Sequence, residues 1–161
     1  KKLTHSILEI GLGYYGGTHI LWRLIFNKVI TIEIDIKNIK RFVMNETISF
    51  RDIFIIGNSQ DPKIFKKTKK ILRNINQVDV LFIDGDHSYE SVKNDYFIYR
   101  KLVKKGGIIA FHDSFCTLEE IGFGVNRFLK ELQEGLIDGK RHIINNIVFS
   151  QAVGISWEEK E

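Results

Sequence analysis

The sequence predicts an α/β protein whose seven-stranded, doubly wound and mostly parallel sheet ends in an antiparallel hairpin. First, short β-branched apolar runs alternate with amphipathic helical segments five times along the chain. Parallel strands need such helical crossovers, so the alternation is typical of a parallel sheet with helices on both faces. Second, the two final apolar runs, 143–149 and 152–157, have no helical segment between them. They therefore favour a hairpin at one edge of the sheet.

The expected elements follow one another without repeats, low-complexity tracts or linkers, which indicates a single domain over residues 1–161. The five parallel strands are expected at 6–10, 29–34, 53–56, 78–83 and 108–111. Apolar residues at helical spacing predict helices over 18–26, 36–43, 62–75, from Ser88 to Gly106, and 125–136. Asp61 and Pro62 occupy the cap and first positions that a helix favours.

The composition is that of a packed globular protein, with 43% hydrophobic residues and 12% aromatic residues. We find no signal peptide and no apolar run of the roughly 20 residues that a membrane span needs. Cys116 is the single cysteine, which fits a reducing compartment such as the cytoplasm. The net charge of +4 owes much to residues 63–73, which we interpret as the solvated face of one helix. Phe65 is the single aromatic residue among these lysines and does not make a platform for base stacking, which argues against a nucleic-acid partner.

A glycine-rich turn follows the first expected strand. Gly11, Gly13 and Gly16 form the pattern G-x-G-x-x-G, which allows a sharp turn and lets a ligand approach backbone N–H groups. Many nucleotide sites share this pattern, so the nearby Glu9 is more informative. A carboxylate in a buried strand needs a partner, and a cationic ligand suits it better than a pyrophosphate. Glu9 therefore favours S-adenosylmethionine over NAD.

Polar residues end all five parallel strands, at the edge where ligands bind in open α/β sheets. Glu33 lies 22 residues after Gly11, the usual spacing for a carboxylate that binds ribose hydroxyls. Its alternative role, capping the next helix, could be filled by Asp35. The segment 58–60 could bind an adenine edge or simply form a turn. The two remaining polar segments are Asp84-Gly85-Asp86-His87 and His112-Asp113.

These segments resemble the class I S-adenosylmethionine-dependent O-methyltransferases, and in particular the catechol and caffeoyl-CoA types and the macrocin and cephalosporin-biosynthesis types. The resemblance covers most of 7–113, and 82–89 is its most specific segment. It implies a Rossmann-like fold and a small hydroxylated acceptor. The implied cofactor-binding residues are Glu9, Gly11, Gly13 and Asp84 around the methionine part, Glu33 on the ribose, and Ser59 and Gln60 near adenine, with Gly16 completing the glycine turn.

The resemblance also suggests catalytic residues. His87 lies three residues after Asp84, where catechol-type enzymes carry a lysine that is taken to be the general base. A histidine could deprotonate a hydroxyl near neutral pH; alternatively, His87 caps the following helix or binds Asp86. The other histidines, His5, His19 and His142, are expected to be structural.

A divalent cation is expected at Asp84, His112 and Asp113. The intervals of 28 and 29 residues from Asp84 match those between metal ligands in catechol O-methyltransferase. That enzyme family has aspartate and asparagine at the last two positions, however. An imidazole ligand suits Mn²⁺, Fe²⁺ or Zn²⁺ better than Mg²⁺. Alternatively, Asp84 serves the cofactor alone.

Three other functions are alternatives to O-methylation. Amino-group methyltransferases of adenine or glutamine usually carry Asn-Pro-Pro-Tyr after the fourth strand, which this chain lacks because Pro62 is its single proline. Glu9 and Asp84 would face the phosphates of a dinucleotide and so argue against an NAD-linked oxidoreductase. A non-catalytic cofactor-binding domain of a larger protein stays open, because the numbering starts almost directly on the first strand, without helices for an N-terminal lid. The sequence leaves open the acceptor and any homo-oligomer.

Overall fold

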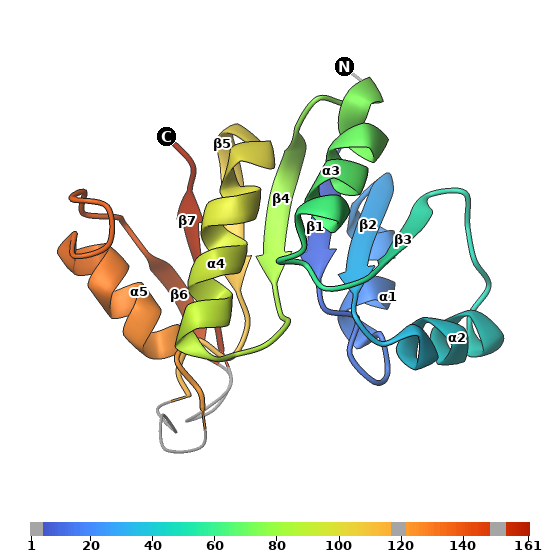
Figure 1. Ribbon diagram of the computed structural model, residues 1–161, viewed down its shortest axis with the longest axis horizontal. Helices are drawn as coiled ribbons and strands as arrows, with labels where there is room; N and C mark the ends of the chain where they lie inside the picture. The colour runs from blue at the N-terminus through green and yellow to red at the C-terminus, as the bar shows by residue number, and fades with distance from the viewer. Residues whose placement is uncertain (1–4, 117–121, 149–153) are drawn as a thin grey trace.

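The computed structural model describes residues 5–116, 122–148 and 154–161, and in this part of the chain all strands belong to one sheet (Figure 1). The order of the seven strands across the sheet is β3-β2-β1-β4-β5-β7-β6. Their bounds are β1 Ser6–Ile10, β2 Lys28–Glu33, β3 Asp52–Ile56, β4 Val78–Ile83, β5 Val103–Phe111, β6 Asn145–Val148 and β7 Gly154–Glu159.

The sheet is parallel from β1 to β5, and β6 and β7 form the antiparallel edge. From β1 the chain winds outward through β2 and β3, then returns to β4 on the other side of β1. The winding direction therefore reverses between β1 and β4, and such a switch point leaves a crevice beyond the carboxyl ends of the strands. The predicted fold class is confirmed.

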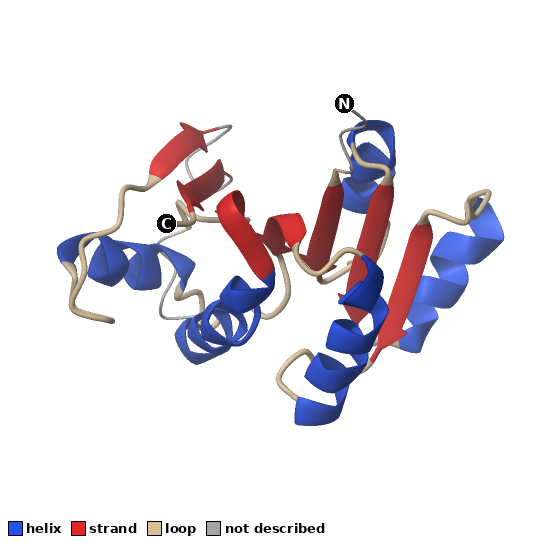
Figure 2. Ribbon diagram, turned by 90° about the horizontal axis from the view of Figure 1, so that it is seen from above, coloured by secondary structure: helices blue, strands red, loops and turns tan. Residues whose placement is uncertain are grey.

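Helices cover both faces of the sheet (Figure 2). Strand residues alternate between the faces, so Leu8 and Ile30 join one core while Ile7 and Val29 join the other. Both faces are buried, which explains the nearly continuous apolar strands. The α-helices are α1 Gly17–Ile25, α2 Ile36–Asn45, α3 Pro62–Ile71, α4 Tyr89–Tyr99 and α5 Val125–Glu134, and short 3₁₀ turns at Leu72–Asn74 and Arg100–Leu102 follow α3 and α4.

Two helix starts follow the sequence signals directly. The Asp61 side chain accepts a hydrogen bond from the N–H of Lys63, and Pro62 is the first residue of α3. Asp35 caps α2 in the same way, by accepting from the N–H of Lys37. Because Asp35 fills this role, the carboxylate of Glu33 is not needed as the cap of α2.

The expected end of the fourth helix and start of the fifth strand are wrong. Gly106 and Gly107 do not end the helix; they lie inside β5, which begins at Val103. Pairing with β4 passes from Val78–Val103 directly to Val80–Ile108, so the intervening residues of β5 bulge out. A Cβ on Gly107 would lie 2.7 Å from the carbonyl oxygen of Asp79, which leaves room for glycine alone.

The final hairpin is confirmed, although β7 extends to Glu159 rather than ending at residue 157. Residues 149 and 152–153 of the expected strands lie outside the described residues. In the described part of the chain, no helix is long and apolar enough to cross a membrane.

Candidate functional site

A cavity of about 440 Å³ opens at the carboxyl ends of β1 to β4, where the winding reverses. Its walls combine the glycine turn, the end of β2, the loop after β3 and the loop after β4. Its lining residues include Gly11, Gly13, Glu33, Ser59, Gln60, Asp84 and Asp95. The structure thus brings together six of the eight predicted cofactor residues, the exceptions being Glu9 and Gly16.

The glycine turn is shaped by contact between two strand ends. Gly11 has a φ of +92°, and a Cβ there would lie 2.0 Å from the carbonyl oxygen of Asp84. Gly13 has a φ of +65° and also lines the cavity. Gly16 does not line it: a Cβ there would lie 2.4 Å from the Phe42 ring, so this glycine lets α1 pack against α2. Gly16 has this packing role in the structure, and its place in the ligand site stays a prediction.

Glu33 joins β2 to the glycine turn. Its Oε2 accepts hydrogen bonds from the backbone N–H groups of Leu12 (2.8 Å) and Gly13 (3.2 Å), and its Oε1 accepts from Asp35 (2.8 Å). A carboxylate can accept about four hydrogen bonds, so Glu33 retains acceptor capacity for a ligand. It is nearly buried and forms part of the cavity wall.

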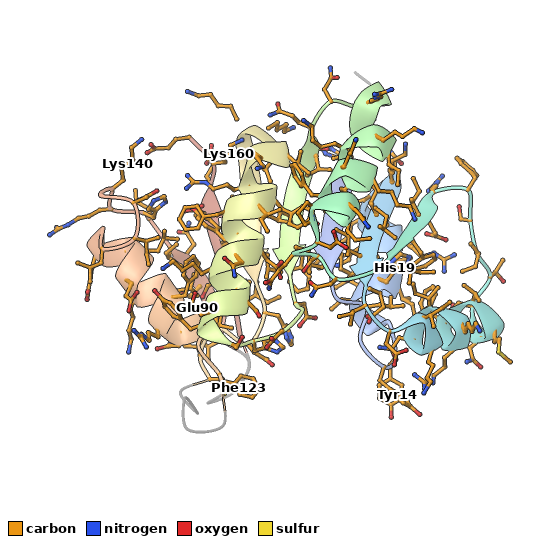
Figure 3. All side chains as sticks on the ribbon, viewed as in Figure 1. Tyr14, His19, Glu90, Phe123, Lys140 and Lys160 are labelled. Atoms are coloured by element: carbon orange, nitrogen blue, oxygen red, sulfur yellow. The ribbon has the colours of Figure 1, made fainter. Side chains whose placement is uncertain are left out.

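Glu9 lies away from the cavity, contrary to the prediction that it binds a cationic ligand. Its side chain is fully buried on the α1 face of the sheet. Oε1 accepts from the Trp22 indole (3.0 Å), and Oε2 accepts from the Thr31 hydroxyl (2.7 Å). The ring of His19, drawn in Figure 3, lies 3.4 Å from Oε2. The partners that a buried carboxylate requires are thus supplied by the protein itself.

The loop after β3 is held by α4. The Ser59 hydroxyl donates to Oδ1 of Asp95 (2.7 Å), and the Tyr99 hydroxyl donates to the Ser59 carbonyl (2.7 Å). Asp95 and Tyr99 lie one helical turn apart, so a single face of α4 fixes this loop. Sequence reasoning missed Asp95. The available signal was a carboxylate at helical spacing between Val92 and Tyr99, on the stripe that faces the core.

A second cluster of polar side chains adjoins the cavity at Asp84. The Nδ1 of His112 lies 3.0 Å from Oδ1 of Asp84, and the Nε2 of His87 lies 3.4 Å from the same oxygen. Asp113 has a φ of +50°, and its carboxylate oxygens lie 3.3 Å from the His112 nitrogen and 3.7 Å from the His87 nitrogen. The structure therefore brings all three predicted metal ligands together and adds His87 to them.

The charges in this cluster favour an ionised Asp84 beside a protonated His112. Burial opposes ionisation of Asp84, but the adjacent rings of His112 and His87 outweigh it and lower its pKa. The adjacent Asp84 carboxylate raises the pKa of His112, against the opposing effect of burial. His87 Nε2, His112 Nδ1 and Asp113 Oδ1 are buried atoms without a hydrogen-bond partner of good geometry among the described residues. Such atoms call for a bound partner.

His87 does not cap α4. The N-cap residue of α4 is Ser88, and the preceding Asp86 carboxylate accepts hydrogen bonds from the Ser88 N–H (3.0 Å) and from the Ser91 hydroxyl (2.8 Å). The His87 ring stacks on Phe123 with centroids 5.3 Å apart, at the carboxyl edge of the sheet (Figure 3). This stacking directs its Nε2 toward Asp84 and Asp113.

Comparison with known proteins identifies the family. A model described as a methyltransferase domain matches residues 12–114, which is more than half of the chain, so the chain belongs to this methyltransferase family. The uncharacterised protein R132 of Acanthamoeba polyphaga mimivirus is 42% identical over 62 residues, which cover 37% of this chain and 28% of that protein.

Solved structures of methyltransferases share the fold. MycE, in complex with Mg, S-adenosylhomocysteine and mycinamycin VI, matches with a TM-score of 0.66 and 20% identity, over 99% of this chain and 46% of MycE. The O-methyltransferase TomG from Streptomyces achromogenes, in complex with S-adenosylmethionine, matches with a TM-score of 0.71 and 15% identity, over 98% and 74% of the two chains. The chain spans less than half the length of R132 and MycE.

Asp95 generates a prediction about stability. Burial raises its pKa from 3.8 to about 6, against the hydrogen bond from Ser59. The folded state therefore binds a proton more tightly than the unfolded state, and stability falls as the pH rises from about 4 to about 6. At higher pH this costs about 2–3 kcal/mol. We expect Asp95→Asn to remove this fall in urea-unfolding experiments, while the exposed Asp61→Asn control keeps it. An unchanged fall in Asp95→Asn would contradict the assignment.

Proposed function

We propose that the chain is an S-adenosylmethionine-dependent O-methyltransferase that acts on a small hydroxylated acceptor. The observation that carries this proposal is the position of Asp84, which lines the cavity and also contacts His112 in the polar cluster. A cofactor in the cavity and an acceptor at the cluster would therefore meet at one side chain. Membership of the methyltransferase family and the shared fold of TomG and MycE support this assignment.

The cavity suits the parts of S-adenosylmethionine in a definite order. In this proposal, Gly11 and Gly13 border the methionine part, Glu33 binds the ribose hydroxyls, and Ser59 and Gln60 lie near adenine, with Asp84 beside the sulfonium. When bound, the cofactor supplies an electrophilic methyl group, which passes to the acceptor oxygen as the sulfur–carbon bond breaks and its electrons stay on sulfur. Carboxylates along one wall favour a ligand that carries positive charge.

The polar cluster suits a divalent cation. Donor atoms of Asp84, His87 and His112 lie within 4.8 Å of one another, and Asp113 adds a further carboxylate. In this proposal, Asp84, His112 and Asp113 hold the metal, and mixed nitrogen and oxygen donors favour Mn²⁺, Fe²⁺ or Zn²⁺ over Mg²⁺. MycE is solved with Mg, which places a divalent cation in a protein of this fold. A cation here would lower the pKa of an acceptor hydroxyl.

We assign His87 the role of general base. Its Nε2 points into the cluster where the acceptor oxygen would lie, and it would take the hydroxyl proton as the methyl group is transferred. A nitrogen that binds a metal has no lone pair left for a proton. His87 therefore either accepts the proton or binds the cation, and the two roles predict different results.

Glu33 provides the first test, with Glu9 as the matched control. We expect Glu33→Ala to weaken S-adenosylhomocysteine binding by about 1.5–3 kcal/mol in calorimetry, the scale of a hydrogen bond to a charged group. Glu9→Gln should lower thermal stability but leave this affinity within about twofold, because Glu9 is buried behind the sheet. Equal losses of affinity in the two variants would contradict this placement of the ribose.

His87 and His112 provide the second test. We expect the visible absorption of bound Co²⁺ to be lost in His112→Ala and retained in both His87→Ala and the remote control His5→Ala. Methyl transfer from labelled cofactor to a panel of small hydroxylated compounds should fall about 100-fold or more in His87→Ala. Loss of Co²⁺ binding in His87→Ala would make His87 a metal ligand and overturn its assignment as the base.

A further inference from the structure

Asp95 is a buried carboxylate in the cavity wall, on the side formed by α4. Its side chain is 1% exposed, and it is one of the residues that line the cavity. Oδ1 accepts the hydrogen bond from Ser59, in the loop predicted to contact adenine. Oδ2 lies toward the loop after β4, since a Cβ built on Gly85 would be 3.7 Å from it. The carboxylate thus lies between the two loops that flank this end of the cavity.

The surroundings of Asp95 leave its charge poorly compensated. Within the described ranges, no lysine, arginine or histidine forms an ion pair with it, and the nearby charge of Asp86 further disfavours ionisation. A buried carboxylate is stable only with enough hydrogen-bond donors, and one hydroxyl uses a fraction of its acceptor capacity. A ligand that presents an N–H group to this wall would supply the missing donor.

The same carboxylate disfavours a ligand that presents an oxygen atom to this part of the wall. An ionised carboxylate accepts hydrogen bonds and donates none, so a carbonyl oxygen facing it would leave two acceptors in contact without a proton. Sites built around a buried polar group reject analogues that cannot pair with it more strongly than sites that merely exclude bulk. The chemistry of this wall therefore discriminates between an amino group and a carbonyl group.

We propose that Asp95, together with Ser59, selects the base of the bound nucleoside by accepting a hydrogen bond from the 6-amino group of adenine. The inference rests on the proposed function, because it assumes that the nucleoside part of the cofactor lies against this wall. Tyr99, one helical turn after Asp95 on α4, acts as a positioning residue. Its hydroxyl donates to the Ser59 carbonyl and so holds Ser59 beside Asp95. Hypoxanthine, which carries a carbonyl oxygen at position 6, is the base that this arrangement rejects.

The test compares S-adenosylhomocysteine with S-inosylhomocysteine, in which a carbonyl oxygen replaces the 6-amino group and N1 gains a proton, in calorimetry on the full chain at about pH 7.5. We expect the unaltered chain to bind the adenosyl compound at least about tenfold more tightly, the scale of one hydrogen bond to a charged group. In Asp95→Asn the amide can turn its NH₂ toward the carbonyl oxygen, so the preference should fall to within about threefold. The control Asp61→Asn, an exposed cap on the neighbouring helix, should retain the full preference.

The possible failures are distinguishable. Two results would overturn the role of Asp95 and leave the proposed function intact. In the first, the unaltered chain binds the two compounds with affinities within about twofold of each other; in the second, Asp95→Asn retains the full preference for the adenosyl compound. Failure of the unaltered chain to bind either compound would overturn the proposed function, and this inference with it.

A second measurement needs no variant. At about pH 5 the carboxyl of Asp95, whose pKa is about 6, becomes protonated and can donate to the carbonyl oxygen. The preference for the adenosyl compound should therefore shrink between about pH 7.5 and about pH 5. The other acidic groups of the cavity, Glu33, Asp84 and Asp86, affect both compounds alike, so the ratio of affinities cancels their contributions. A ratio that is constant over this pH range would also overturn the proposal.

Discussion

The site depends on the close approach of two strand ends, where the chain after β1 passes over the chain after β4. The N–H of Asp84 donates to the carbonyl of Ile10, and the N–H of Gly11 donates to the carbonyl of Ile32. These bonds extend the pairing of three strands into the loops and leave no space for a side chain at Gly11. The same contact fixes the glycine turn on one side and the Asp84 side chain on the other. Both the cavity and the polar cluster are therefore built on one backbone junction.

Three buried carboxylates lie near this junction, and each is stabilised in a different way. Glu9 is satisfied by side chains of α1 and β2, and so belongs to the core. Glu33 is satisfied largely by backbone N–H groups, which gives it a structural role in the turn as well as a place in the wall. Asp95 has a hydroxyl partner and a raised pKa. Of the three carboxylates, Asp95 has the fewest protein donors, a single hydroxyl, and its remaining acceptor capacity is available to a ligand.

The fold could be predicted because its signals are local. Apolar periodicity locates strands and helices, and Asp61 with Pro62 marks a helix start within two residues. Gly106 and Gly107 were misread because a glycine pair that ends a helix and one that forms a bulge look the same in sequence. The bulge is set by pairing with β4, a contact between segments about 25 residues apart.

The site was predicted less completely, because several of its contacts join residues that are distant in the sequence. The ends of parallel strands meet at one edge, so Glu33, Asp84, His112 and Asp113 could be grouped from their positions alone. Glu9 was misplaced because alternation along β1 directs its side chain to the α1 face, and its donors Trp22 and Thr31 are distant in sequence. Asp95 was missed because its importance comes from Ser59, 36 residues earlier in the chain.

Helix α4 connects this site to the far edge of the sheet through adjacent residues. Asp95 holds the loop after β3, while the hydroxyl of the next residue, Tyr96, donates to Glu158 on β7 (2.8 Å). Glu158 is in turn bound by His142, which precedes β6 (2.6 Å). One rigid helix therefore spans the distance between the C-terminal hairpin and the cavity wall. A substitution in the hairpin that displaced Tyr96 would therefore act on the same helix that holds the loop after β3.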